Sequence, residues 1–141
     1  MGVAGLLVRF ASRLDDAANR AALAFRAAVE AARPAGVEET AASLGSVFLR
    51  FDPGVTDHAA LSAEMAVLLA GRDWRAAALP AGRRIWTIPA VFDGPDLPAA
   101  AGLAGLSPAA AVADLTAARV RVLAIGFAPG LPYMGPLPEH W

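Results

Sequence analysis

The first 92 residues alternate between two hydrophobic periods, and this alternation restricts the fold more than any other feature of the chain. Residues 5–10 carry apolar side chains at every second position, as in a strand with one buried face. Asp15 or Asp16 then begins a helix that runs to about residue 32. The apolar stripe of this helix recurs at helical spacing and consists of Ala18, Ala22, Phe25 and Val29.

The same alternation continues along the chain. Strand patterns at residues 37–42 and 46–51 are separated by turn residues. A second helix begins at Thr56 or Asp57, either of which can cap it, and ends at Gly71. The order so far is therefore strand, helix, strand, strand, helix.

A fourth strand is predicted at residues 83–91, where Pro89 indicates a sheet edge or the end of the strand. In this order each helix can cover one face of a four-stranded antiparallel sheet. Residues 1–92 are therefore predicted to form an α+β domain of the ferredoxin-like type, a fold that hosts many functions. Its predicted core consists of Leu6, Val8, Phe25, Val47, Leu49, Leu61, Met65, Leu68 and Ile88.

Composition excludes several kinds of chemistry. The sequence has no Cys and no Lys, hence no thiol nucleophile, no thiolate metal site, no Schiff-base lysine and no phosphate-loop lysine. His58 and His140 lie in unrelated contexts, so we assign no metal site, and we assign no catalytic residue. With a net charge of −1, the chain lacks the excess of basic residues that is typical of proteins that bind nucleic acid.

The mean hydropathy of +0.49 raises the question of a membrane. Two nearly uncharged runs, residues 97–113 and 122–138, are both broken by Pro and Gly. Neither supplies the roughly 20 unbroken apolar residues of a spanning helix. The N-terminus lacks the basic region of a signal peptide. We therefore expect no membrane association and a cytoplasmic location.

After residue 92 the sequence predicts two short helices and a strand that leads into a bare, stiff loop. Asp96 is placed either to cap the helix at residues 97–103 or to line a site beside the loop, and Ser107 caps the next helix. The strand at residues 119–125 ends at GFAPGLPYMG, residues 126–135. Its prolines remove N–H donors, unlike a phosphate-binding loop. The loop is either a connector with packed aromatic residues or an apolar wall for a ligand or partner.

This loop resembles a family signature. GFAPGLPYMGPLP is similar to the G-F-x-P-G-F-x-Y-L-G motif of the allophanate hydrolase subunit 1 family. That family includes the B-type subunit of bacterial ATP-dependent 5-oxoprolinase, the sporulation-kinase inhibitor KipI and part of the carboxyltransferase region of urea carboxylase. Residues 46–53, 88–97 and 105–122 resemble upstream family segments in the same order, so the likeness covers nearly the whole chain.

The resemblance implies a ferredoxin-like domain followed by a cyclophilin-like β-barrel. Residues 93–141 are then expected to be a helical linker with the first strand and loop of an incomplete second domain, in an excised or truncated chain. The resemblance also implies a ligand- or partner-binding role for residues of this region. These candidates are Asp96, Gly126, Phe127, Pro129, Gly130, Pro132, Tyr133 and Gly135.

Three positions depart from the family pattern. Leu115 stands where the family usually has His, Val120 where it has Tyr, and Leu131 where it prefers Phe. If the family His serves a reaction or a ligand, this chain lacks that group.

The resemblance leaves three functions open. The favoured one is a subunit of an ATP-dependent 5-oxoprolinase, inactive alone and assembled with a subunit 2-type (C-type) partner and a lactam-utilisation protein. In it, ATP belongs to the complex and this chain alone binds no cofactor. The second is a KipI-like inhibitor of a sensor histidine kinase. The third is part of a biotin-dependent carboxyltransferase, which the missing His and barrel disfavour.

Overall fold

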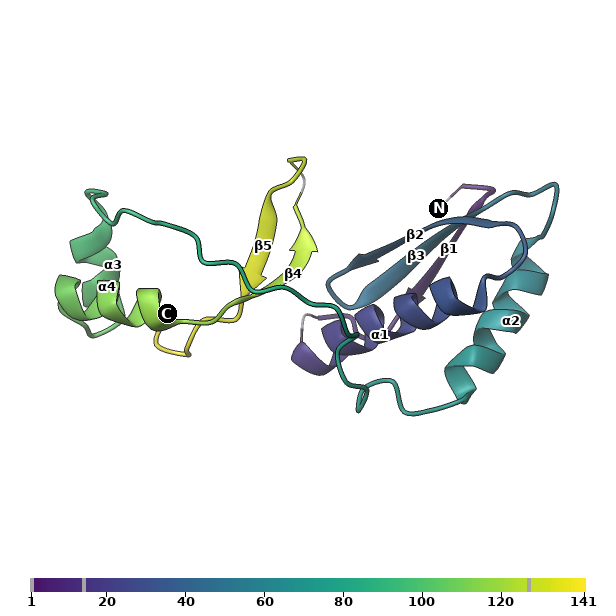
Figure 1. The fold of residues 1–141 in the computed structure, drawn as a ribbon, viewed down its shortest axis with the longest axis horizontal. Helices are drawn as coiled ribbons and strands as arrows, with labels where there is room; N and C mark the ends of the chain where they lie inside the picture. The colour runs from purple at the N-terminus through teal and green to yellow at the C-terminus, as the bar shows by residue number, and fades with distance from the viewer. Residues whose placement is uncertain (1, 14, 127) are drawn as a thin grey trace.

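The computed structural model describes residues 2–13, 15–126 and 128–141. Figure 1 shows an N-terminal unit (residues 2–80) and a C-terminal unit (residues 97–141), joined by a connecting segment (residues 81–96). The N-terminal unit is a three-stranded antiparallel sheet with two helices. The C-terminal unit holds two short helices and a two-stranded hairpin.

The N-terminal unit contains the first five elements that the sequence predicts. The central strand of its sheet pairs antiparallel with both neighbours, in the order β1-β3-β2. A β-bulge interrupts the pairing between Val37 and Glu39. The elements are β1 (Gly5–Arg9), α1 (Asp16–Ala32), β2 (Val37–Ser43), β3 (Ser46–Phe51) and α2 (His58–Ala70).

One hydrophobic core fills the space between the sheet and its two helices. Phe25 of α1 lies at its centre, with its ring edge-to-face against those of Phe10 and Trp74 at centroid distances of 5.6 and 5.1 Å. Most of the predicted core is confirmed: Val8, Phe25, Val47, Leu49, Leu61 and Met65 are buried, and Leu6 and Leu68 pack against them half-buried.

The predicted fourth strand at residues 83–91 is wrong. The whole connecting segment is exposed and contains neither helix nor strand, and Ile88, predicted in the core, is 66% exposed. Strand propensity describes how well a side chain fits a pleated, half-buried surface, so it has little effect where no neighbouring strand takes the backbone hydrogen bonds. The segment runs from the N-terminal unit to the helices of the other unit (Figure 1).

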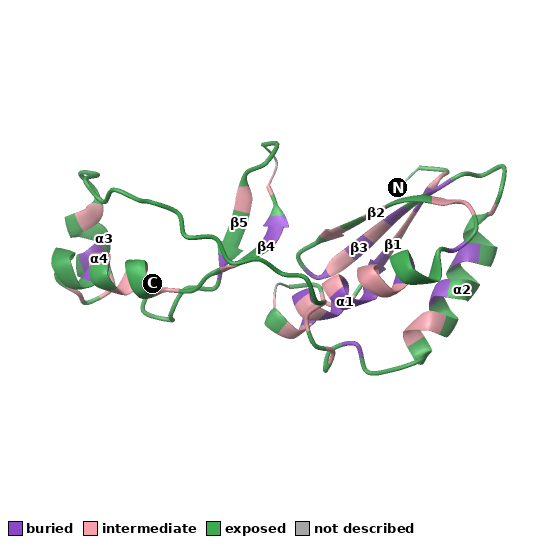
Figure 2. Cartoon of the chain, in the orientation of Figure 1, coloured by how far each residue is buried: buried purple, intermediate pink, exposed green. Residues whose placement is uncertain are grey.

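The C-terminal unit begins with α3 (Leu97–Leu103) and α4 (Pro108–Ala117), which pack against each other and whose buried residues are Ala101 and Ala111. The hairpin follows, with β4 (Arg121–Ile125) antiparallel to β5 (Pro132–Gly135). The sequence predicts β4, but it predicts a loop where β5 forms. Figure 2 shows that much of this unit is exposed, in contrast to the N-terminal unit.

Side chains cap three of the helices at the predicted starts. Asp15 accepts from Ala18 N–H at 2.7 Å, Asp57 from Ala60 at 2.8 Å, and Ser107 from Ala110 at 3.2 Å. The hydrogen bond from Ala18 and the guanidinium of Arg75 lower the pKa of the Asp15 carboxyl, against an opposing effect of desolvation.

Asp96 precedes α3 but forms no capping hydrogen bond, so the predicted cap is wrong there. Its backbone is already helical, with φ −84° and ψ −9°, whereas a capping residue is usually extended.

The mixed α+β class with antiparallel sheets is confirmed. A four-stranded ferredoxin-like sheet does not form within the described residues, and the cyclophilin-like barrel stays a prediction. No single helix in the described part of the chain is long and apolar enough to span a membrane. By length and composition, α3 and α4 together reach that criterion, with a bend of 81° between them.

Candidate functional site

The GFAPGLPYMG loop folds as the turn of the β4–β5 hairpin. The Gly126 N–H donates to the carbonyl of Leu131, and the Leu131 N–H donates to the carbonyl of Ala128 at 3.0 Å. Gly130 has a φ of +79°, a conformation that favours glycine. The candidate residue Phe127 lies outside the described residues. The glycines of the loop therefore belong to a tightly closed turn.

Gly126 is required by the close approach of two other groups. A Cβ atom at this position would come within 2.8 Å of the Leu131 carbonyl oxygen and 2.9 Å of the Tyr133 ring. The ring of Tyr133 thus packs against bare backbone at the start of the turn. This contact joins two of the candidate residues that the family signature shares.

We expect Gly126→Val to open this turn. The new side chain would overlap a backbone oxygen, and forcing extra atoms into such a space typically costs about 1–3 kcal/mol. Hydrogen exchange of the residue 126 amide should become fast, and the Tyr133 ring resonances should shift. Gly94→Ala is the matched control, because nothing lies within 4 Å of a Cβ there. A protected amide in the Gly126→Val chain would contradict the assigned turn geometry.

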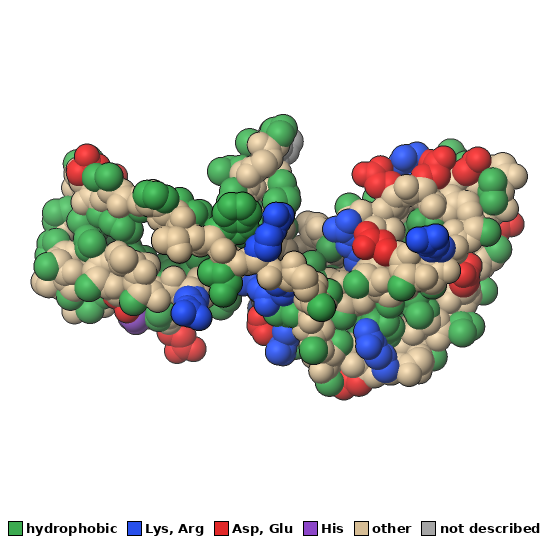
Figure 3. Space-filling model, viewed as in Figure 1, with side chains coloured by type: hydrophobic (Ala, Val, Ile, Leu, Met, Phe, Trp, Pro, Cys, Tyr) green, Lys and Arg blue, Asp and Glu red, His purple; other side chains and the backbone are tan. Residues whose placement is uncertain are grey.

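The hairpin presents apolar side chains on its exposed surface. Leu131 is 52% exposed and Tyr133 is 48% exposed, so neither is buried by its own unit. The space-filling view shows hydrophobic side chains gathered along the hairpin (Figure 3). The remaining large exposed apolar side chains of the two strands are Val122, Ile125 and Met134. These five residues are called the hairpin surface below.

The structure does not bring all candidate residues together. Gly126, Pro129, Gly130, Pro132, Tyr133 and Gly135 belong to the hairpin. Asp96 instead precedes α3, which lies well apart from the β4–β5 turn (Figure 1). Leu115 lies in α4 and Val120 directly precedes β4. The two positions that lack the family His and Tyr therefore both come shortly before the hairpin in the sequence.

Asn19, which sequence reasoning missed, connects the hairpin to the N-terminal unit. Its side-chain amide is 1% exposed and donates to the carbonyls of Leu44 at 2.6 Å and Leu123 at 3.0 Å. Beside it, Arg121 donates to Asp16 at 2.6 Å. The only available signal was a lone Asn next to the apolar stripe of α1 in an alanine-rich helix, which is too weak to identify a partner 104 residues away.

A second polar cluster ties the last residues to α4. One oxygen of Asp114 accepts from the Trp141 indole at 2.7 Å and lies 3.0 Å from Nε2 of His140. These two hydrogen bonds lower the pKa of the Asp114 carboxyl, and desolvation opposes them. The arrangement pairs an acid with an imidazole, but no nucleophile is placed beside it by any described contact.

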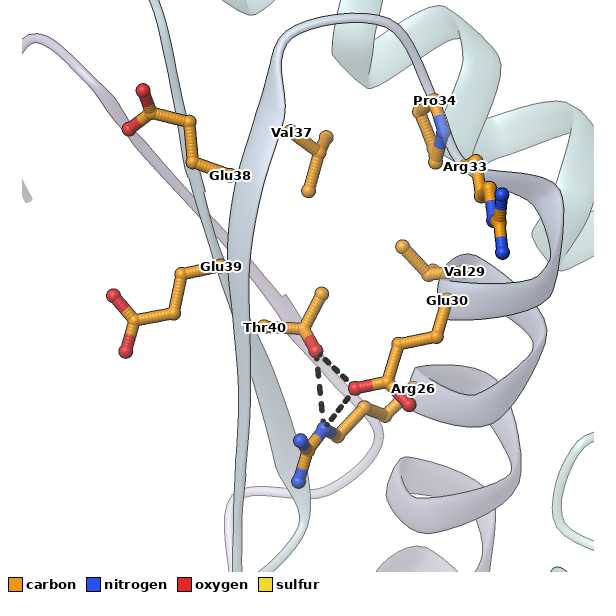
Figure 4. A pocket seen from close by; sticks show the side chains of 9 residues that line it. All are labelled: Arg26, Val29, Glu30, Arg33, Pro34, Val37, Glu38, Glu39 and Thr40. Carbon is orange, nitrogen blue, oxygen red and sulfur yellow. Dashed lines mark hydrogen bonds and ion pairs between the residues drawn. The ribbon is translucent and has the colours of Figure 1, made fainter.

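An open groove of about 560 Å³ lies between α1 and β2 (Figure 4). Arg26 donates to Glu30 at 2.9 Å and to Thr40 at 3.1 Å, and the Thr40 hydroxyl donates to Glu30 at 2.7 Å. These side chains therefore bind one another across the groove, in place of a ligand. Among the described residues, no three His, Asp or Glu side chains come together as a metal-binding set.

Comparison with known proteins identifies the chain at the level of its family. The model of the carboxyltransferase domain, subdomain C and D, matches residues 1–141. The chain belongs to this family. The match confirms the family resemblance that the loop and its upstream segments indicate.

The chain is also similar to two proteins of known structure. The chain is similar to TTHA0988 in crystal form P212121, with 32% identity over 99% of this chain and a TM-score of 0.74. In crystal form P6522 the same protein gives 30% identity over 98% of this chain and a TM-score of 0.73. The uncharacterised protein PH0987 from Pyrococcus horikoshii is 21% identical over 99% of this chain and 64% of its own, with a TM-score of 0.42.

The carboxyltransferase-domain chain spans about a quarter of TTHA0988, since the two matches cover 27% and 26% of that protein. None of the curated proteins compared with the chain matches it.

Proposed function

We propose that this carboxyltransferase-domain chain is one subunit of an ATP-dependent amide or lactam hydrolase of the 5-oxoprolinase type. The observation that carries the proposal is the GFAPGLPYMG turn, held closed against Tyr133 at the tip of an exposed apolar hairpin. This motif resembles the signature of the family that includes the B-type subunit of 5-oxoprolinase. The hairpin surface then forms one wall of a site that partner proteins complete.

The chemistry of amide hydrolysis explains why partners are needed. Resonance makes a lactam carbonyl a poor electrophile, and phosphorylation of its oxygen by ATP would make the carbon reactive. Covalent or acid–base catalysis then needs an activated group held by a second residue and oriented by a third. This chain has no Cys, no Lys and two widely separated His, so we assign the ATP site and the catalytic groups to a subunit 2-type partner and a lactam-utilisation protein.

The same family assignment supports a proposal about architecture. A two-stranded hairpin is marginal by itself, and three or more strands or a covering helix are usually needed. We assign β4 and β5 to the start of a cyclophilin-like barrel whose other strands lie outside this sequence. The exposure of Leu131 and Tyr133 supports this assignment, because further strands would cover them.

A second candidate function is inhibition of a sensor histidine kinase, as in KipI. An inhibitor needs an apolar binding surface and no catalytic group, and Leu115 in place of the family His favours it. The hairpin surface would contact the helical dimerisation domain of the kinase. A carboxyltransferase acting on carboxybiotin is the third candidate, and the same missing His disfavours it.

The test is an assay of ATP-dependent 5-oxoproline hydrolysis with purified proteins. We expect no turnover by the chain alone, and turnover when both partner proteins are added. Tyr133→Ala should lower the rate of the mixture about tenfold or more, equivalent to at least one lost contact of about 1.4 kcal/mol. Leu103→Ala, an exposed change in α3, should leave the rate unchanged.

Other outcomes of this assay decide between the candidates. Turnover by the isolated chain would overturn the shared-site proposal. A silent mixture together with tight binding to the dimerisation domain of a histidine kinase would replace it with the inhibitor. A rate that Tyr133→Ala leaves intact would remove the hairpin surface from the site.

A further inference from the structure

Within the residues that the structure describes, two features have no strand paired with them, and each could pair with the other. The first is the outer edge of β1, and the second is the strand-like sequence at residues 83–92 in the connecting segment. We propose that residues 83–92 of one copy add as a strand to β1 of a second copy, so that the protein forms a dimer by reciprocal strand exchange. This inference goes beyond the proposed function and does not depend on it.

The accepting edge is defined by the hydrogen bonds of β1. The Phe51 N–H donates to the Ala4 carbonyl and the Phe10 N–H donates to the Gly45 carbonyl. The backbone N–H and C=O groups of the even-numbered residues of this strand therefore point toward β3. Backbone groups of Gly5, Leu7 and Arg9 therefore point outward. Nε2 of His58 lies 3.1 Å from the Gly5 carbonyl oxygen, but in the part of the chain that the structure describes no strand pairs with this edge.

The opposite edge of the same sheet is protected in a way that β1 is not. At that edge β2 carries a β-bulge, and its Glu38 and Glu39 side chains bind Arg50. Bulges and charged side chains are the usual means by which proteins prevent an edge strand from pairing with another chain. No bulge occurs in the pairing of β1, so of the two edges it is the one suited to strand addition.

The donating segment has the composition and the exposure of an unpaired strand. All of residues 81–96 are exposed, including Ile85, Trp86 at 72% and Val91. A run of large apolar side chains that remains in water indicates a binding surface. Pro89 lacks an N–H, which removes a donor from the odd-numbered edge only, so the edge formed by residues 84, 86, 88 and 90 is complete.

One antiparallel register satisfies both partners. It sets Ile88 opposite Leu7 and Trp86 opposite Arg9, so that Trp86 and Ile88 extend the sheet face that already holds Leu7 and the half-buried Phe48. Displacing the segment by two residues in one direction would set Arg84 opposite Arg9, and like charges directly opposite one another are destabilising. Displacing it in the other direction would set Ile88 opposite Arg9 and leave Trp86 beyond the end of β1.

The partner is a second copy because the chain directs its own segment elsewhere. Hydrogen bonds from Asn19 to Leu123 and from Arg121 to Asp16 hold β4 against α1, and the connecting segment runs away from β1 toward α3 (Figure 1). Each copy carries one such segment and one such β1 edge. When two copies exchange these segments with each other, both edges are paired and the assembly closes around a two-fold axis.

Sedimentation equilibrium of the 141-residue chain across the micromolar range tests the proposal. We expect a reversible dimer whose dissociation constant rises about tenfold or more in Ile88→Asp and Trp86→Asp, as for a buried interface residue. The control Val67→Asp changes an equally exposed apolar residue on α2 and should leave the constant unchanged. A synthetic peptide of residues 83–92 should compete and dissociate the dimer.

Hydrogen exchange gives a second readout at the acceptor. The amides of Gly5, Leu7 and Arg9 should be protected at concentrations that favour the dimer and should lose that protection in Ile88→Asp. A monomer over the whole range would overturn the proposal. A dimer that forms without protecting these amides, or one that Ile88→Asp leaves intact, would overturn it equally.

Discussion

Leu49→Asp is expected to abolish cooperative folding of the N-terminal unit. Leu49 is fully buried in the central strand β3, with Leu6 and Thr40 as its register partners on either side. A carboxylate there would be unpaired in an apolar core, a change that costs several kcal/mol at about the same scale as the total stability of a small domain. Circular dichroism should show no thermal transition for this variant.

The control for that experiment is Val67→Asp, which adds the same charge at a residue that is 76% exposed on α2. An exposed substitution of this kind changes stability by about 0.5 kcal/mol or less. If Leu49→Asp melted like the parent chain, β3 could not be the centre of this sheet.

Phe25→Ala should lower the free energy of unfolding by about 3–5 kcal/mol, the usual cost of removing a buried aromatic ring and leaving a cavity. The ring is completely buried and contacts both Phe10 and Trp74, so its removal would leave a cavity in the core. Urea unfolding followed by tryptophan fluorescence measures the change directly, because Trp74 is one of the ring's neighbours.

Val67→Ala tests whether that loss is specific to the core, since it removes apolar atoms from an exposed site. It should shift the urea midpoint only slightly. A Phe25→Ala chain with the parent's midpoint would show that α1 does not pack on the sheet through this face.

The elements that sequence reasoning predicted correctly are those whose cause is local. Four apolar residues at helical spacing identify α1, and Asp15 caps it through a hydrogen bond within its own first turn. Alternating side chains likewise identify β3. In each case the residues that determine the structure lie within a few positions of one another, where a sequence pattern can be recognised.

The wrong predictions concern two kinds of structure. One depends on partners that are distant in the sequence, and the other depends on the backbone conformation of a single residue. Residues 83–91 have the composition of a strand but pair with no strand of their own chain in the part that the structure describes. Asp96 has the right residue type for a cap but a helical backbone. The turn formed by Gly126 and Leu131 was expected to be rigid, yet its continuation as β5 depends on pairing with β4.

The candidate site was predictable only in part, for the same reason. The motif GFAPGLPYMG was recognisable because its glycines and prolines lie within ten consecutive residues. The close approach of Tyr133 explains why residue 126 is a glycine. Nothing in the motif indicates that Asp96 lies elsewhere, or that a buried amide of α1 supports the strand leading into the turn.

Asn19 has a consequence for anyone who wishes to cut this protein into parts. A cut near residue 92 looks natural because it falls in the exposed connecting segment, but it would remove β4 and with it the Leu123 carbonyl, one of the two acceptors of the Asn19 amide. A hydrogen bond of this kind contributes about 0.5–1.5 kcal/mol. An N-terminal unit cut out in this way should therefore lose about that much stability, whereas a fragment that retains β4 should keep the bond.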